Sequence, residues 1–183
     1  MRPDPGDRHD GAAAEPGPRG ADARTVAEVV RTALASAGVP WEEPRPGRFE
    51  VTLPGEHKQR THVTLVVGEH SLRVSAFVAR RPDENHEGVY RWLLERNARA
   101  AGLAFTVDRA GDVYLVGRLP LAAVSEVEVD RLLGSVLEQA DGSFDTILEL
   151  GFASAIRAEW RWRLDRGEST ANLAAFAHLR PTD

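Results

Sequence analysis

The sequence predicts an α+β domain in which helices cover a five-stranded antiparallel sheet. Segments in which apolar and polar residues alternate are joined by short turns, which favours antiparallel pairing with one solvent-exposed face. Three segments with apolar residues at helical spacing precede, interrupt and follow these strands, so the expected order is α-βββ-α-ββ-α. A length of 183 residues suits one domain with tails.

The N-terminal segment, residues 1–21, is rich in Pro, Gly, Ala and charged residues, and Met1 is its only large apolar side chain. Ordering a residue costs about 1–2 kcal/mol of backbone entropy, and this segment has little apolar surface to bury in return. We therefore expect a disordered tail at 1–21, an α+β domain at 22–166, and a C-terminal extension with a short helix at 167–183.

The first predicted helix spans residues 23–37, with Asp22 as its N-cap. It ends because Gly38 suits the left-handed C-terminal position and Pro40 prevents continuation. Five alternating segments follow in two groups, divided by the second helix. Their apolar residues are Phe49, Val51 and Leu53; Val63, Leu65 and Val67; Leu72, Val74, Ala76 and Val78; Leu103, Phe105 and Val107; and Val113 and Leu115, which alternate with Tyr114 and Val116.

Two later helices are predicted from their starting residues and apolar stripes. Residues 82–85 (Pro-Asp-Glu-Asn) open the second helix, because their carboxylates suit the positive helix N-terminus. Residues 125–128 have the pattern of a capping box for the third helix. Its apolar stripe keeps one phase over 129–151, so we expect a single uninterrupted helix across Gly142, despite a cost of about 1 kcal/mol for that glycine.

The apolar phase changes after Gly151. The new stripe consists of Phe152, Ile156 and Trp160. Either the helix bends at 151–154, or its far end packs against something other than the sheet. A short final helix is expected after Ser169 or Thr170, and it docks on its own domain or in the groove of a partner. The residues expected on one side of this helix are Leu173, Phe176 and Ala177.

Catalytic and metal-binding chemistry is not indicated. The chain has no cysteine, no Gly-rich phosphate loop and no nucleophile elbow. No two of its 6 histidines have the i, i+4 spacing of a helical zinc site. The polar cluster 83–87 lacks the spacing of a calcium loop, and we interpret it as the capped N-terminus of the second helix. We therefore expect no enzyme, no cofactor and no metal.

Charge and hydropathy limit the classes of partner. The net charge of −5 argues against a dedicated nucleic-acid binder, which carries a basic excess. The apolar runs are far shorter than the roughly 20 residues of a membrane span, and the N-terminus has no signal-peptide pattern. We therefore expect a cytoplasmic protein without a membrane partner.

Several phrases of the sequence resemble actinobacterial members of the YbjN family. They are PDENHEGVYRWLL at 82–94, Asn97, and GDVYLVGR at 111–118. The resemblance spans about residues 24–165 and implies a fold similar to that of type III secretion chaperones. It also implies a protein-binding or regulatory module that dimerises through its sheet or second helix, and it imports no active site. We interpret Asn97 as ending the second helix in the left-handed region, and Tyr114 as lying on the second face of the sheet.

Two functional hypotheses follow. The first is a non-enzymatic protein-binding or regulatory module that contacts a protein partner or a second copy, as a homodimer, through apolar side chains. The candidate residues for that contact are Trp92, Phe152, Ile156, Trp160 and Phe176. The alternative is a regulator that touches nucleic acid through residues 157–163, because arginine and aromatic side chains stack on bases. Its candidate residues are Arg157, Arg161, Trp162 and Arg163.

Overall fold

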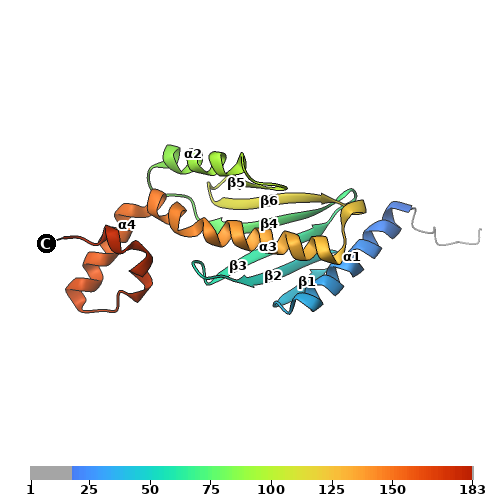
Figure 1. Cartoon of the computed structure of the whole chain (residues 1–183), viewed down its shortest axis with the longest axis horizontal. Helices are drawn as coiled ribbons and strands as arrows, with labels where there is room; N and C mark the ends of the chain where they lie inside the picture. Colours follow the sequence, from blue (N-terminus) through green and yellow to red (C-terminus); the bar gives the residue numbers. More distant parts are fainter. Residues whose placement is uncertain (1–17, 183) are drawn as a thin grey trace, which may run out of the picture.

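The structure, a computed structural model, describes the backbone of residues 18–182 and the side chains of residues 23–182 (Figure 1). The first helix, α1 (Pro18–Ala37), begins before Asp22, which we predicted as its N-cap. Residues 18–21 of the predicted tail therefore belong to this helix, and residues 1–17 lie outside the described part of the chain. Proline is well tolerated at the first helical position, because it has no N–H to leave unpaired there.

One antiparallel sheet forms the centre of the molecule, with six strands in the order β1-β2-β3-β4-β6-β5. The strands are β1 (Trp41–Arg45), β2 (Arg48–Pro54), β3 (Arg60–Val67), β4 (Ser71–Ala79), β5 (Leu103–Val107) and β6 (Val113–Pro120). The predicted segments at 49–53, 63–67, 72–78, 103–107 and 113–116 all lie in strands. The α+β class and the antiparallel sheet are therefore confirmed.

The expectation of five strands was wrong, because β1 is a sixth. Its sequence, Trp-Glu-Glu-Pro-Arg, has no apolar alternation and contains Pro44. A proline is tolerated in an edge strand, which pairs on one side only. The strand is held instead by charge: Glu43 accepts hydrogen bonds from the Arg31 guanidinium at 2.7 and 3.0 Å and from the Gly47 N–H at 2.8 Å.

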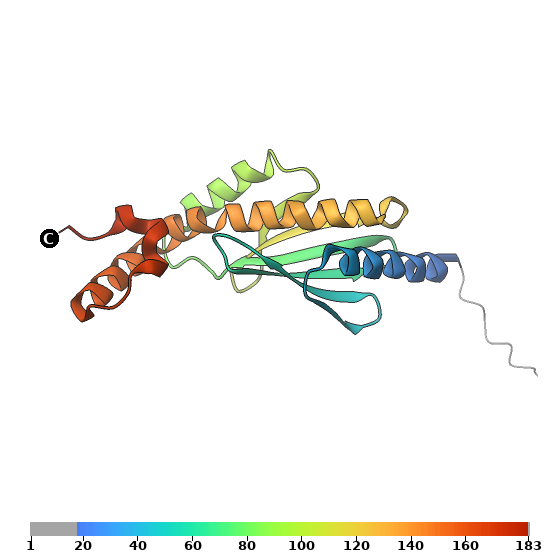
Figure 2. The same cartoon turned by 60° about the horizontal axis from the view of Figure 1, so that its bottom comes forward.

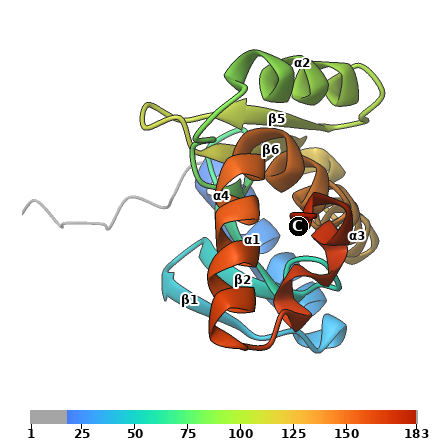
Figure 3. The same cartoon turned by 90° about the vertical axis from the view of Figure 1, so that its left-hand side faces the viewer.

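Helices α1, α3 and α2 and the start of α4 lie on one face of the sheet (Figures 2 and 3). Their bounds are α2 (His86–Asn97), α3 (Glu126–Gly142) and α4 (Phe144–Arg166), and a 3₁₀ turn, η1 (Leu121–Ala123), connects β6 to α3. Ser125 caps α3 as predicted, because its Oγ accepts the Glu128 N–H at 3.2 Å. The largest fully buried side chains of this main core are Leu34, Phe49, Leu65, Leu72, Leu115 and Ile147.

The predicted single helix across Gly142 was wrong, because the helix is interrupted at Ser143 between α3 and α4. The interruption directly follows Gly142, whose low helix propensity makes it the weakest point of the run. Ser143 has φ −100° and ψ −12°, which is close to helical. The rotation along the chain is therefore almost kept, and the apolar stripe continues in phase on both sides of the break.

A second irregularity in α4 accounts for the phase change of the apolar stripe. Phe152 has the non-helical angles φ −143° and ψ 18°, so α4 bends there, which was one of the two alternatives open from the sequence. Beyond the bend, α4 and the 3₁₀ segment η2 (Ala171–Leu179) pack together at the end of the molecule (Figures 1 and 3). We call this unit the C-terminal unit. Its own small core consists of Phe152, Ile156, Trp160, Leu173 and Phe176.

Candidate functional site on the uncovered sheet face

The second face of the sheet is not covered by any helix in residues 18–182 (Figure 3). Burial alternates along β2, β3, β4 and β6, so that every second side chain points into the main core and the others point to this face. Alternation follows from the pleat of a strand, whose successive side chains point to opposite sides. The side chains on the uncovered face are half-buried or exposed.

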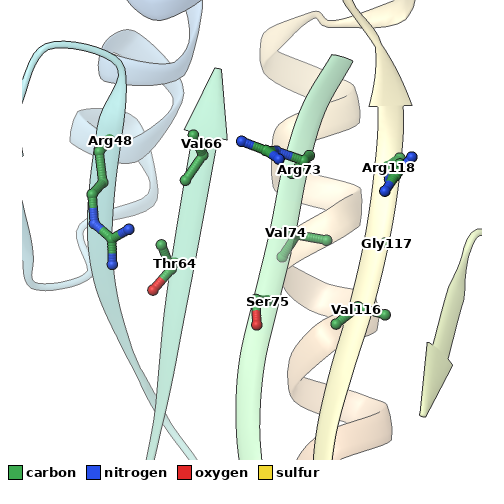
Figure 4. Close-up of a pocket in the computed structure, with 9 residues that line it drawn as sticks. All are labelled: Arg48, Thr64, Val66, Arg73, Val74, Ser75, Val116, Gly117 and Arg118. Atoms are coloured by element: carbon green, nitrogen blue, oxygen red, sulfur yellow. The ribbon is translucent and has the colours of Figure 1, made fainter. Parts of the chain in front are cut away.

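The strand register arranges these side chains in three rows across the sheet. The first row contains Arg48, Val66, Arg73 and Arg118, which are successive cross-strand partners. The second row contains Glu50, Thr64, Ser75 and Val116. The third row contains Thr52 and His62 on one side and Phe77 and Tyr114 on the other. A shallow groove of about 480 Å³ runs over the first two rows (Figure 4).

The arginines of the first row differ in their partners. Arg48 is neutralised by Glu50, which accepts from its Nε at 2.7 Å and from the Thr64 hydroxyl at 2.7 Å. Arg73 on β4 and Arg118 on β6 are cross-strand partners, and the Arg73 side chain extends toward β3 (Figure 4). Neither arginine has a carboxylate partner in the part of the chain that the structure describes. Both are exposed. Like charges directly opposite on a sheet repel each other.

The third row supplies the aromatic part of this face. Phe77 and Tyr114 contact each other edge to face, with ring centroids 5.5 Å apart. Tyr114 therefore lies on the second face of the sheet, as predicted. The Lys58 ammonium lies 4.8 Å from the centroid of the Phe77 ring. Together the three rows present guanidinium groups at one end, hydroxyls and Val116 in the middle, and aromatic rings at the other end.

Lys58, the one lysine in the sequence, connects the β2–β3 loop to β4. Its Nζ donates to the carbonyls of Phe77 and Val78, at 2.5 and 3.0 Å, beside a β-bulge in β4. These carbonyls lie beyond the last β3–β4 partner pair, Val63 and Ala76, so the ammonium takes the place of a strand donor. Burial lowers the pKa of Lys58 to about 8, against the opposing attraction of the Asp141 carboxylate.

Asp141 at the end of α3 holds the same loop from the covered side. Its carboxylate accepts the backbone N–H groups of Glu56, His57 and Lys58 at 3.1, 3.2 and 2.8 Å. Burial on its own would raise the pKa of Asp141, but the three N–H donors outweigh burial, and the pKa lies below its usual value. Gly55 is required here, since a Cβ at that position would come within 2.2 Å of the Asp141 Oδ1.

The phrase at 82–88 has a structural role at the bend in α4. The N–H groups of Asp83 and Glu84 both donate to the carbonyl of Gly151, the residue just before the bend, at 3.0 and 3.2 Å. The Glu84 carboxylate accepts the backbone N–H of Ser154 at 2.6 Å and its hydroxyl at 2.8 Å. These bonds lower the pKa of Glu84. We call this set of contacts the kink clamp.

The interpretation of 83–87 as side-chain caps of α2 was therefore wrong. Asn85 is the N-cap residue of α2 but makes no side-chain cap bond, and its amide donates to the Leu150 carbonyl at 3.3 Å. Glu84 caps the part of α4 that follows the bend, a contact between segments about 70 residues apart that local patterns do not reveal. Gly151 allows the close approach, because a Cβ there would lie 2.8 Å from the Pro82 Cβ.

Asn97, another residue on which the family resemblance rests, also makes a tertiary contact. Its side chain accepts the Phe105 N–H at 2.7 Å and donates to the Phe105 carbonyl at 3.1 Å, which ties α2 to the edge strand β5. The predicted left-handed conformation at Asn97 was wrong. In the described residues the one non-glycine residue with positive φ is Asn85, at 48°.

The five predicted partner-binding residues do not form one exposed surface. Four of them, Phe152, Ile156, Trp160 and Phe176, are buried in the C-terminal unit, where the Trp160 indole N–H donates to the Phe176 carbonyl at 3.2 Å. Trp92 lies apart from them, half-buried on the main core against the Phe105 ring. The apolar side chains of Phe152, Ile156 and Trp160 pack against η2 of the same chain, which was one of the two docking alternatives left open by the sequence.

The four residues of the nucleic-acid alternative lie on the outer side of the C-terminal unit. Arg163 is bound to Glu159 at 2.7 Å and to the Ser169 carbonyl at 2.8 Å. Trp162 is 43% exposed, and the Arg166 guanidinium lies 4.8 Å from its ring. Arg157 and Arg161 are exposed.

Between residues 18 and 182, no group of three or more His, Asp or Glu side chains is placed to hold a metal ion. Within the same residues, no helix has the length and apolar content needed to cross a membrane.

Comparisons with known proteins agree with the fold. The sequence model of the YbjN family, described as "Putative bacterial sensory transduction regulator", matches residues 27–149. Uncharacterized protein Rv0487 of Mycobacterium tuberculosis (strain ATCC 25618 / H37Rv) is 55% identical over 163 residues, which cover 86% of this chain and 89% of that protein.

Two solved structures align with this chain. A chain of the ExsC–ExsE complex aligns with a TM-score of 0.51 and 21% identity, over 65% of this chain and 90% of that chain. A chain of the ExoU–SpcU complex from the type III secretion system of Pseudomonas aeruginosa aligns with a TM-score of 0.47 and 17% identity, over 66% of this chain and 96% of that chain. The expected type III secretion chaperone-like fold is confirmed.

Proposed function

The chain belongs to the YbjN family, and from that premise we propose that it is a non-enzymatic binding module that holds an extended segment of a protein partner on its uncovered sheet face. The observation that carries the proposal is the set of three ordered rows, which no helix covers in residues 18–182. The YbjN family is described as a regulator, and a regulator can act by binding another protein.

The three rows combine half-buried apolar side chains with hydroxyl groups, and both kinds can contact a partner. Val66, Val116, Phe77 and Tyr114 are only half-buried, so a partner would remove further apolar surface from water. Such burial contributes about 25 cal/mol per Å², less the cost of association. The hydroxyls of Thr64 and Ser75 lie between them and can bind polar groups of a partner (Figure 4). Because the sheet backbone is already ordered, little conformational entropy is lost on this side of the interface.

Fold likeness alone does not transfer a function. The solved structure of similar fold is a complex of two proteins, ExsC and ExsE, which makes a protein partner the first class to test. The sheet face suits that partner better than the apolar residues of the C-terminal unit, since those residues already pack against η2.

A second copy of the chain is the second candidate partner, and α2 offers it a surface. Leu94 is 67% exposed on the outer side of α2, beside Tyr90 and Ala98. Glu87, Arg91 and Glu95 border this surface. An isologous contact, in which each copy presents the same patch, would bury Leu94 of both copies.

The test of the sheet face uses peptides as probes. A phage-displayed library of random dodecapeptides is selected on the full chain, and enriched peptides are measured by fluorescence anisotropy. We expect Val116→Asp, in the second row, to abolish binding, because it places a charge among the buried contacts of the complex. The milder change Val116→Thr, which keeps the shape, should weaken binding less.

The matched control is Val127→Asp, since Val127 is 66% exposed on α3, away from the sheet face. This variant should bind the peptides like the wild type, and circular dichroism should show that all three variants are folded. Failure to enrich any peptide, or equal binding by Val116→Asp and the wild type, would reject the sheet face as the partner surface.

A further inference from the structure

We infer that the partner segment is acidic at one end, and that Arg73 and Arg118 bind its carboxylates. This inference rests on the proposed function and specifies the chemistry of the partner. The two arginines are direct cross-strand partners in the first row, at the edge of the groove (Figure 4).

The first reason is electrostatic. Exposed arginines without a partner are ordinary on a protein surface, but two placed directly opposite each other on a sheet repel. Arg48 in the same row is compensated by Glu50, with Nη2 to Oε1 at 2.6 Å. No carboxylate of the described residues compensates Arg73 or Arg118 in this way. Carboxylates from another chain would offset both charges, and each carboxylate can accept two parallel hydrogen bonds from one guanidinium.

The second reason is that the positive charge is local. The whole chain has a net charge of −5, so its overall field repels an acidic segment. Ions screen such a field over about 8 Å at physiological salt, and attraction therefore depends on charges at the contact itself. The first row places two uncompensated guanidinium groups beside Val66 and Val116, which supply apolar contact.

The rows also fix the spacing that the segment needs. Arg73 and Phe77 lie four residues apart on the same face of β4. At about 3.3 Å per residue, the guanidinium row and the Phe77–Tyr114 pair are about 13 Å apart. An extended segment would therefore carry Asp or Glu about four positions from an apolar or aromatic residue. Thr64, Ser75 and Val116 lie between these two ends.

The experiment extends the peptide selection with charge variants of the full chain. We expect the enriched peptides to contain Asp or Glu about four positions from an apolar residue. The double variant Arg73→Gln/Arg118→Gln should bind them about tenfold more weakly, as two exposed ion pairs are lost. Raising NaCl from 0.05 to 0.5 M should weaken binding to the wild type and have little effect on the double variant.

The matched control is Arg157→Gln/Arg161→Gln, which removes the same charge from exposed positions on the C-terminal unit. It should bind the peptides like the wild type. If the enriched peptides lack acidic residues, or if both double variants bind equally well, the acidic partner is refuted. Loss of binding in Val116→Asp would in that case still support the sheet face, so the two proposals fail separately.

A free anion could also bind the two guanidinium groups, so the last test compares inorganic phosphate with the peptide. Inorganic phosphate is added at the same ionic strength as a chloride control. We expect no specific competition, because the groove is open and the apolar contacts belong to the peptide. If phosphate displaced the peptide far more effectively than chloride did, the guanidinium pair would be an anion site, and the inference of an acidic protein segment would be wrong.

Discussion

Replacing Asp141 by Asn removes the charge that attaches the β2–β3 loop to α3. In the wild type the carboxylate accepts three backbone N–H groups, and its side chain is buried, with 8% of the residue exposed. An Asn side chain keeps one acceptor, which can still bind the Lys58 N–H. Its amide group replaces the Oδ2 and faces the Glu56 N–H, donor against donor.

The magnitude follows from the bonds that are lost or weakened. A hydrogen bond to a charged group contributes about 1.5–3 kcal/mol, and an unpaired buried donor costs about 1–3 kcal/mol. Because the loop can relax toward water, we expect Asp141→Asn to lower the free energy of unfolding by about 2–3 kcal/mol. For a chain of this size the melting temperature then falls by about 6 °C.

The assay is urea unfolding followed by circular dichroism, with amide hydrogen exchange of the β2–β3 loop as a local readout. The matched control is Asp130→Asn, the same change at an exposed position of α3, which should alter the free energy of unfolding by less than about 0.5 kcal/mol. If Asp141→Asn were as stable as this control, with unchanged exchange at residues 56–58, the carboxylate would not hold the loop.

Three further predictions concern pH, the kink clamp and self-association. The fold lowers the pKa of the Asp141 carboxyl, so the charged carboxylate stabilises the fold fully above its pKa in the unfolded chain, about 3.9. That stabilisation is lost as the pH falls through the lower pKa of the folded state. The difference in the free energy of unfolding between wild type and Asp141→Asn should therefore shrink below about pH 4. Glu84→Gln should speed amide exchange at residues 152–155 several-fold, with the exposed Glu87→Gln as control. Unchanged exchange in Glu84→Gln would show that the kink clamp does not stabilise the bend. Leu94→Arg should convert a dimer to a monomer by light scattering if α2 forms the contact, whereas a monomeric wild type would exclude that contact.

The fold class was predictable because it depends on local periodicity. Alternating apolar residues mark the strands at 49–53, 63–67 and 72–78, and each of these segments lies in the sheet. The cap of α3 was also predictable from the sequence, because Ser125 and Glu128 lie within one turn of the chain. The edge strand β1 was missed, because its stability comes from pairing and from the Arg31–Glu43 ion pair rather than from an apolar pattern.

The candidate site was not predictable from the sequence in the same way. Arg73 and Arg118 are 45 positions apart, and only the β4–β6 register makes them neighbours. The predicted apolar contact residues illustrate the same limit: Ile156 and Trp160 share one side of a helix, as expected from their spacing, and that side packs against η2. A stripe shows which residues share a face, and it does not show what covers that face.

By itself, the sequence determined the kinds of elements and the side of each that avoids water, because strand and helix periods are properties of neighbouring residues. It also carried the phrases by which the family was identified. Tertiary structure decided which distant groups meet: Glu84 with Ser154, Asp141 with the β2–β3 loop, and the arginines of the first row with each other. These contacts depend on strand register and on two irregularities of one helical run, which are set by the packing of the whole chain.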